Sequence, residues 1–133
     1  MNPKKMFNTN INIRGYELDS FGHLNNAVYI NYLEQARWEI LNLSGYLKSF
    51  RSSGLLLVVV DTHIRYMKEL QLFDNIEIQT KIVVESPFII FKHHIINKEN
   101  NNKHARATIK TILIDQNRLP IDIPEEFILF LTK

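Results

Sequence analysis

One long segment with the period of an amphipathic helix, followed by segments with the pattern of strands, constrains the fold of this chain most. From Asn26 to about Leu43, apolar residues recur at the spacing that places them on one side of an α-helix. Ser44 and Gly45 follow, and glycine commonly terminates a helix. The pattern predicts one long helix with a broad face to bury. That face contains Tyr29, Ile30, Leu33, Ala36, Ile40, Leu41 and Leu43.

The other regular segments have the pattern of strands, and no helical segment separates the last four. The expected strands are residues 8–14, 55–66, 75–85, 88–97 and 105–115. Residues 98–103 and 116–120 have turn compositions, and residues 121–133 are expected to form a short tail. Strands joined by short connections are antiparallel. The sequence therefore predicts a single α+β domain over residues 1–133, in which one long helix lies on a five-stranded antiparallel sheet.

The apolar run from Leu55 to Val60 predicts contact with a second chain. A strand of a half-solvated sheet alternates apolar and polar residues, whereas this run is apolar on both faces. One helix covers only one face of a sheet. The other face, or the edge of the strand, is expected to be covered by another copy of the chain in a homodimer.

Composition excludes several classes of function. The formal net charge is +2, and Lys and Arg are scattered singly except for Lys4 and Lys5, so no basic stripe predicts nucleic-acid binding. Cysteine is absent, which excludes disulfides, thiolate metal sites and a cysteine nucleophile. No apolar run approaches the ~20 residues of a membrane span, and residues 1–7 lack the apolar core of a secretion signal. A cytoplasmic protein without metal or cofactor is expected.

The segment from Asp19 to Tyr29 is the best organised for chemistry. It runs from a single carboxylate, through Gly22, into the start of the predicted helix. A helix start leaves roughly four backbone N–H groups without intrahelical partners and carries the positive end of the helix dipole. Asp19 is too far upstream to be the helix cap, a role that suits Asn25 or Asn26. We expect a cleft in which Asp19 faces an ester or thioester carbonyl while the amides around Asn26 and Ala27 polarise its oxygen.

Further residues are candidates for the same site, each with an alternative role. Gly22 permits a sharp turn and close approach of a substrate to the backbone. His23 is a candidate to orient Asp19, to position water or to act as a general acid, but it is equally compatible with a structural role in the loop. Asp61 and His63 share one strand face with Arg65. They are candidates to line a cleft between subunits, or to form a solvated ladder of charges.

The remaining charged and titratable residues suggest structural roles. Glu34 and Arg37 are three residues apart on the helix, and Arg37 projects into the apolar face, so an ion pair between them is expected. The other histidines lack the spacing of metal ligands and are expected to be ordinary strand and turn residues. These are His93, His94 and His104.

The run from Asp19 to Trp38, DSFGHLNNAVYINYLEQARW, resembles the signature of hotdog-fold acyl-CoA thioesterases of the 4-hydroxybenzoyl-CoA thioesterase-like family. The typical form is D-x-x-G-H-V-N-N-x-x-Y, followed by a helix with E-x-A-R. The resemblance implies a homodimer, or a dimer of dimers, with active sites between subunits at the start of the central helix. It implies that Asp19 is the catalytic carboxylate and that the backbone N–H of Asn26 polarises the thioester. The plant acyl-carrier-protein thioesterases have a similar run, with asparagine in the place of Phe21.

These observations predict a hydrolase that cleaves the thioester of an acyl-CoA, with Asp19 as general base or nucleophile. The catalytic candidates are Asp19, His23 and Asn26. The substrate-binding candidates are Gly22, Asn25, Ala27, Asp61 and His63. A hotdog-fold hydratase, a non-hydrolytic acyl-CoA binding protein and an acyl-carrier-protein thioesterase remain as alternatives. The sequence leaves the acyl group, and the choice between CoA and a carrier protein, open.

Overall fold

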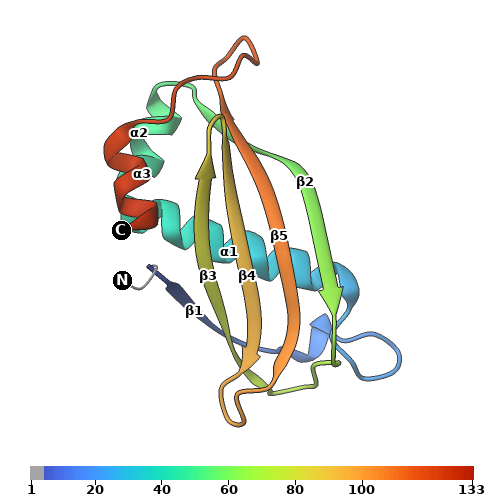
Figure 1. Ribbon diagram of the computed structural model, residues 1–133. Coiled ribbons are helices and arrows are strands. Elements are labelled where there is room, and N and C mark those ends of the chain that lie inside the picture. The colour runs from blue at the N-terminus through green and yellow to red at the C-terminus, as the bar shows by residue number, and fades with distance from the viewer. Residues whose placement is uncertain (1–4) are drawn as a thin grey trace.

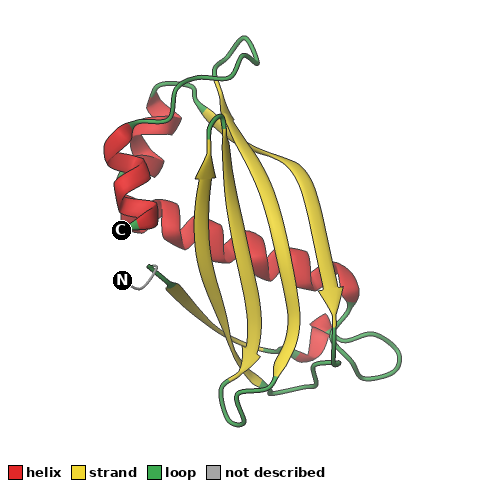
Figure 2. Ribbon diagram, in the orientation of Figure 1, coloured by secondary structure: helices red, strands yellow, loops and turns green. Residues whose placement is uncertain are grey.

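The computed structural model describes residues 5–133, and its elements follow the predicted order with two additional helices (Figures 1 and 2). The strands are β1 (Phe7–Asn12), β2 (Leu56–Tyr66), β3 (Asn75–Glu85), β4 (Phe88–Asn97) and β5 (Lys103–Ile114). The helices are α1 (Asn26–Ser44), α2 (Tyr46–Ser52) and α3 (Glu125–Thr132), and a 3-10 turn, η1 (Gly15–Glu17), precedes α1. Residues 1–4, part of the segment predicted not to be a secretion signal, lie outside the described residues.

The five strands form one antiparallel sheet, as predicted. Their order is β1-β3-β4-β5-β2, so β1 and β2 are the two edge strands. β2 pairs with β5 alone, and its register shifts between Val59 and Asp61, which makes Val60 the bulged residue. The α+β fold with an antiparallel sheet and one long helix is confirmed.

Helix α1 lies across one face of the sheet (Figure 1). Its start is capped by the Asn25 side chain, which accepts a hydrogen bond from the Ala27 backbone at 2.9 Å. Its end is closed by Gly45, which has φ +81° and donates its backbone N–H to the Asn42 carbonyl at 3.2 Å. The predicted start, cap and stop of this helix are thus confirmed. Its buried apolar residues belong to the same core as residues of the sheet: Tyr29, Tyr32, Leu33, Ala36, Ile40 and Leu41. Ile30 and Leu43, which were expected on this buried face, are exposed because they lie at its margins.

Helices α2 and α3 were not expected from the sequence, and α3 lies within residues 121–133, which were expected to form only a short tail. Both helices are too short to be stable alone, so tertiary contacts stabilise them. Phe50 of α2 and Phe127 of α3 meet edge to face with ring centroids 5.2 Å apart, and the Tyr46 ring packs against both in tilted geometry. This aromatic cluster holds α2 and α3 side by side near the end of α1 (Figure 1).

All three helices lie on the same side of the sheet, so the opposite face of the described chain carries no helix (Figures 1 and 2). The strand register assigns side chains to the two faces, because directly paired residues project to the same side. Val58 pairs with Ile112, and Leu56 pairs with Ile114, on the face away from α1. Leu57 and Val59 project toward α1. The beginning of β2 is therefore apolar on both faces, as its sequence predicted.

Candidate functional site

The loop before α1 is a closed turn that fixes the position of Asp19. Leu18 and Leu24 form an isolated bridge, and the backbone N–H of Asp19 donates to the His23 carbonyl at 2.8 Å. Gly22 donates to the Asp19 carbonyl at 3.1 Å and has φ +79°, a conformation that costs most other residues free energy. Space around Gly22 is open. The predicted sharp turn is confirmed, and its requirement for glycine comes from the backbone angle.

The carboxylate of Asp19 is oriented by the backbone of its own loop. Its Oδ1 accepts hydrogen bonds from the N–H groups of Phe21 at 2.9 Å and His23 at 3.1 Å. Its Oδ2 accepts no hydrogen bond from residues 5–133, and the residue is exposed. The imidazole of His23 is half-buried and forms no hydrogen bond within the same residues. In this chain, therefore, the amide of His23 rather than its ring holds Asp19, which leaves one carboxylate oxygen accessible.

The first turn of α1 presents one amide without a partner. The N–H of Asn25 donates to the Glu17 carbonyl, that of Ala27 to the Asn25 side chain, and that of Val28 to the Asn25 carbonyl, each at 2.9 Å. The N–H of Asn26 donates to no atom of residues 5–133. The Ala27 amide, expected to help polarise a substrate, is thus engaged by the cap. Asn26 is the position whose backbone N–H remains available at the positive end of the helix.

Two neighbouring segments hold the loop from outside. The N–H of Leu24 donates to the Leu70 carbonyl at 2.8 Å, and His23 bridges to Gln71. On the other side, the buried Glu17 accepts hydrogen bonds from the Tyr32 hydroxyl and from the guanidinium of Arg14, with Nε at 3.1 Å.

The electrostatics of Glu17 favour its ionised form. Burial by itself would raise the pKa of Glu17, but the hydrogen bonds from Arg14 and Tyr32 outweigh burial and hold the pKa below its usual value. Because the Glu17 backbone carbonyl also accepts the N–H of Asn25, this ionised side chain stabilises the segment that leads into α1.

Two tyrosines border the site, and sequence reasoning did not assign them a role. The hydroxyl of Tyr66, at the end of β2, donates to the Asn26 carbonyl at 3.3 Å. Its ring meets that of Tyr29 edge to face, with centroids 4.9 Å apart. Burial, with smaller contributions from Tyr66, Glu69 and Asp19, raises the pKa of Tyr29 to about 12. The placement of Tyr29 in the signature run was the one available signal, whereas Tyr66 required the fold.

The structure places Asp61 and His63 away from the other candidates. Asp61 pairs with Lys110 and His63 with Thr108, all on the sheet face opposite α1. Within one chain these two side chains do not converge with Asp19 or Asn26. The structure thus brings together Asp19, Gly22, His23 and the residues 25–27, and leaves Asp61 and His63 on a separate surface.

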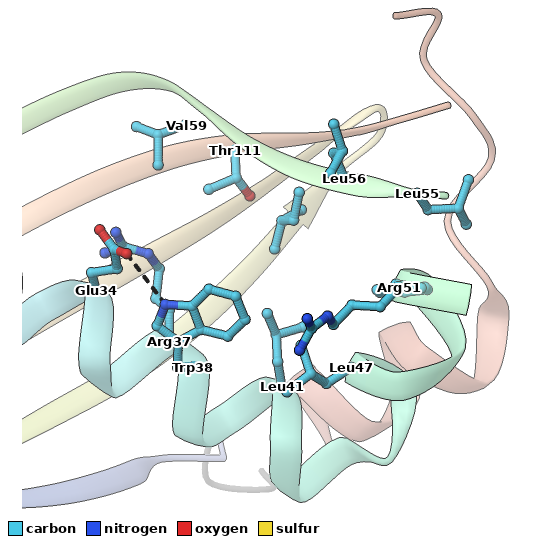
Figure 3. Close-up of a pocket in the computed structure, with 12 residues that line it drawn as sticks. Glu34, Arg37, Trp38, Leu41, Leu47, Arg51, Leu55, Leu56, Val59 and Thr111 are labelled. Carbon is cyan, nitrogen blue, oxygen red and sulfur yellow. Dashed lines mark hydrogen bonds between the residues drawn. The ribbon is translucent and has the colours of Figure 1, made fainter. Parts of the chain in front are cut away.

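A mostly apolar pocket lies farther along α1. It has a volume of about 370 Å³ and lies between α1, α2 and the beginning of β2 (Figure 3). Apolar side chains form most of its wall, among them Trp38, Leu41, Leu47, Leu55, Leu57 and Val59. Neither Asp19 nor residues 25–27 line this pocket or two other pockets formed by residues 5–133. The cleft expected beside Asp19 is therefore not one of these three pockets of residues 5–133.

Arg37 lies in the wall of this pocket, and its predicted ion pair with Glu34 is not formed. Glu34 instead accepts a hydrogen bond from Trp38 Nε1 at 3.2 Å (Figure 3). Within residues 5–133, the pair Arg14–Glu17 is the only one within ion-pair distance. Arg37 is buried because its guanidinium extends to the sheet, where Nη1 contacts His93 Nε2 at 3.3 Å.

This contact fixes the state of His93. Because a guanidinium can only donate, Nε2 accepts, and Nδ1 carries the proton that it donates to Thr80 Oγ1 at 2.8 Å. Burial, aided by the positive charge of Arg37, lowers the pKa of His93 to about 3. His93 is thus a neutral core residue, and no group of three or more potential metal ligands occurs among the described residues.

The arrangement of a long helix on a five-stranded antiparallel sheet, with the signature loop at the helix start, is the hotdog fold of thioesterases. A profile of the thioesterase-like superfamily matches residues 13–131, and the chain belongs to that superfamily. The structure of YbaW from Escherichia coli, a probable thioesterase, superposes with a TM-score of 0.85 at 27% identity, over 95% of this chain and 98% of YbaW. No helix of the described chain is both long and apolar enough to cross a membrane.

Two curated relatives carry specific names. The chain is 36% identical over 74 residues to the long-chain acyl-CoA thioesterase FadM of Escherichia coli, and the match covers 56% of each protein. It is 30% identical over 116 residues to the acyl-acyl carrier protein thioesterase ATL3 of Arabidopsis thaliana, over 86% of this chain and 61% of the relative. The matches therefore span only 56% and 61% of the lengths of these relatives.

Proposed function

We propose that this protein hydrolyses acyl-CoA thioesters, with Asp19 as the catalytic carboxylate. The observation that carries the proposal is the pairing of an exposed carboxylate, oriented by two backbone amides, with the unpartnered N–H of Asn26 at the start of α1. Asp19 either removes a proton from an attacking water or attacks the carbonyl carbon itself to form an anhydride that water then cleaves. In both routes, the Asn26 amide stabilises the negative charge that develops on the thioester oxygen. The products are the free acid and the CoA thiol.

We infer that the apolar pocket along α1 receives the acyl chain. Asn26 and Leu41 are both on α1 and 15 positions apart, which corresponds to about 22 Å along the helix axis. Ile30, one turn from Asn26, is exposed and lies on the same side of the helix as the pocket residues Arg37 and Leu41. A chain bound along this side would run from the reacting carbonyl toward α2.

The active protein is proposed to be a homodimer or a dimer of dimers. The outer edge of β2 is unpaired within the described residues 5–133, and apolar surface is exposed along it by Leu56, Val59, Val60 and Trp38. Such an edge associates readily with another strand. A second copy that covers this edge would also close the open side of the site near Asp19.

The names of the relatives support hydrolysis of acyl thioesters and leave two thiol carriers to consider. FadM is named for long-chain acyl-CoA, and ATL3 for acyl groups on a carrier protein. We propose acyl-CoA as the substrate. The second candidate function is that of a thioesterase acting on acyl groups bound to a carrier protein. The observation that favours this second candidate is the distribution of charge on the sheet.

Release of free thiol from a panel of short, long and aromatic acyl-CoAs tests the proposed function. We expect turnover that depends on the acyl group, with the best substrates among chains long enough to fill the pocket. Saturable binding of acyl-CoA without thiol release would contradict hydrolysis and indicate a binding protein. Size-exclusion chromatography with light scattering on the same sample measures the oligomeric state, and a monomer would contradict the proposed assembly.

A further inference from the structure

The sheet face opposite α1 gathers cations that are scattered in the sequence. Strand pairing aligns Arg65, Arg106, His94 and Gln79 in one row across β2, β5, β4 and β3. The adjacent row on the same face consists of His63, Thr108, Lys92 and Lys81. We name these eight positions the basic grid. It contains four Lys or Arg residues and two histidines but no carboxylate.

Within residues 5–133, the cations of the basic grid have no carboxylate partner. Arg65, Lys81, Lys92 and Arg106 are all exposed, and none lies within ion-pair distance of an acidic residue among residues 5–133. The nearest acidic residues lie in the two rows that flank the grid. In one row Asp61 pairs with Lys110. In the other, Ile96 pairs with Glu77 on one side and with Lys103 on the other. Each flanking row thus adds a cation along with its acid.

The charges in this region act on one another. Burial, followed by the positive charges of Lys103, Arg106 and Lys81, lowers the pKa of His94, which lies in the middle of the grid. Electrostatic repulsion among unpaired cations is relieved when an anionic surface binds. The basic grid therefore favours an acidic partner.

The shape of the basic grid favours a protein surface over a nucleotide. Four strands spaced about 4.8 Å apart spread the cations over roughly 14 Å, and the two rows are about 7 Å apart. None of the three pockets described above includes a grid residue. The phosphates of a nucleotide are best held by donors that converge on one point, whereas a flat array of separated cations matches an acidic protein face.

The position of the basic grid connects it to the proposed active site. Arg65 is at one end of the grid, next to Tyr66, and the Tyr66 hydroxyl donates to the carbonyl of Asn26 at 3.3 Å. Tyr66 is also the last residue of β2, so this edge strand ends there. A flexible arm that begins over the grid can pass around the end of β2 to the start of α1 without crossing the sheet.

We propose that the basic grid docks an acidic carrier protein that presents the acyl thioester on a phosphopantetheine arm. Delivery of the acyl group rests on the proposed thioesterase function, whereas docking is independent of turnover. Asp19 then hydrolyses acyl thioesters of both CoA and the carrier protein, but only the carrier protein binds the basic grid.

Charge reversal on the grid tests this proposal in two separate assays. The variant Lys92→Glu/Arg106→Glu reverses two exposed cations. The matched control Lys48→Glu/Lys133→Glu makes the same change in net charge on exposed residues of α2 and the chain end, on the helical side of the molecule. Thermal unfolding confirms the fold of each variant, and Lys92→Gln/Arg106→Gln provides a milder change if the reversal does not fold.

The first assay compares hydrolysis of one acyl group on acyl carrier protein and on CoA. We expect kcat/KM for the protein carrier to fall about tenfold or more in the grid variant, mainly through KM, and to be unchanged in the control. The value for acyl-CoA should change little. An equal loss on both substrates would overturn the proposal, because it would assign the grid to the phosphates of CoA.

The second assay measures binding of fluorescent holo-acyl carrier protein, which has no acyl group to hydrolyse. We expect binding to wild-type protein that weakens as salt increases, loss of binding in the grid variant, and partial recovery with a carrier whose acidic residues are reversed to lysine. No binding to wild-type protein would overturn docking. Binding without hydrolysis of any thioester would overturn the proposed function and leave docking intact.

Discussion

The loop at the start of α1 and the pocket farther along the same helix are built in different ways. In the loop, short-range backbone hydrogen bonds among residues 18–28 set the positions of Asp19 and Asn26. The pocket is assembled from α1, α2, β2 and β5, and the packing of α3 on α2 supports it. Local bonds, anchored by the contacts of Leu24 with Leu70 and of His23 with Gln71, therefore fix the groups proposed for chemistry. Long-range packing shapes the space proposed for the acyl chain.

The comparison predicts that the two regions fail differently when altered. A change in the loop should affect turnover with a modest effect on stability. A change in the aromatic packing behind the pocket should affect the free energy of unfolding first. The following substitutions test this difference, from the largest expected effect to the smallest.

Phe127→Ala should destabilise the protein most. The ring is fully buried against Phe50 and Tyr46, and truncation of a buried Phe costs about 3–5 kcal/mol. Denaturant unfolding measures the loss. The control Leu129→Ala, on the exposed side of α3, should cost far less, and equal losses would contradict a packed role for Phe127.

Glu17→Gln should lower the free energy of unfolding by about 1–3 kcal/mol at neutral pH, because charge-assisted hydrogen bonds to Arg14 and Tyr32 are weakened. Since the pKa of Glu17 is depressed in the folded state, its contribution is present above its unfolded pKa and is lost as the pH falls through the folded pKa. Unfolding measured between neutral and acidic pH should show a weaker acid dependence in the variant. An unchanged pH profile would contradict the assignment.

Val59→Phe should change substrate preference. Val59 lines the pocket, and added bulk there should exclude the end of a long acyl chain. Because each buried methylene contributes about 0.8 kcal/mol, exclusion of two should lower kcat/KM for long chains about tenfold relative to short ones. The control Ile112→Phe adds bulk on the opposite sheet face. A loss independent of chain length would contradict the proposed role of the pocket.

Asn25→Ala removes the cap of α1 and should cost about 1 kcal/mol of stability. Asn25→Ser retains a cap and should restore most of the loss. We expect kcat to fall in the alanine variant, because the first turn that presents the Asn26 amide becomes less ordered. Full activity in a destabilised Asn25→Ala protein would show that order of this turn is not required.

The comparison also explains which features could be predicted from the sequence. Helix α1, its cap and the turn at Gly22 depend on neighbouring residues, so their sequence patterns predicted the helix, the turn and a cap at Asn25 or Asn26, of which the structure has Asn25. Helices α2 and α3 were missed because a short helix depends on distant partners, here Phe50 and Phe127.

Side-chain partners and charge patterns required the register of the sheet. Arg37 was expected to pair with Glu34, three residues away, yet it contacts His93 on β4. Likewise, Lys and Arg are scattered in the sequence, but strand pairing places Arg65, Arg106 and Lys92 on one face. Sequence spacing alone carries no information about which distant strands become neighbours.

The carboxylate of Asp19 is proposed to perform the chemistry beside the Asn26 amide. The most direct measurement is the rate of thiol release from the best acyl-CoA substrate by Asp19→Asn, compared with Ser20→Ala and wild type at matched thermal stability. We predict a loss of at least about 100-fold in kcat for Asp19→Asn and near wild-type activity for Ser20→Ala. A folded Asp19→Asn protein that retains wild-type kcat would contradict the account.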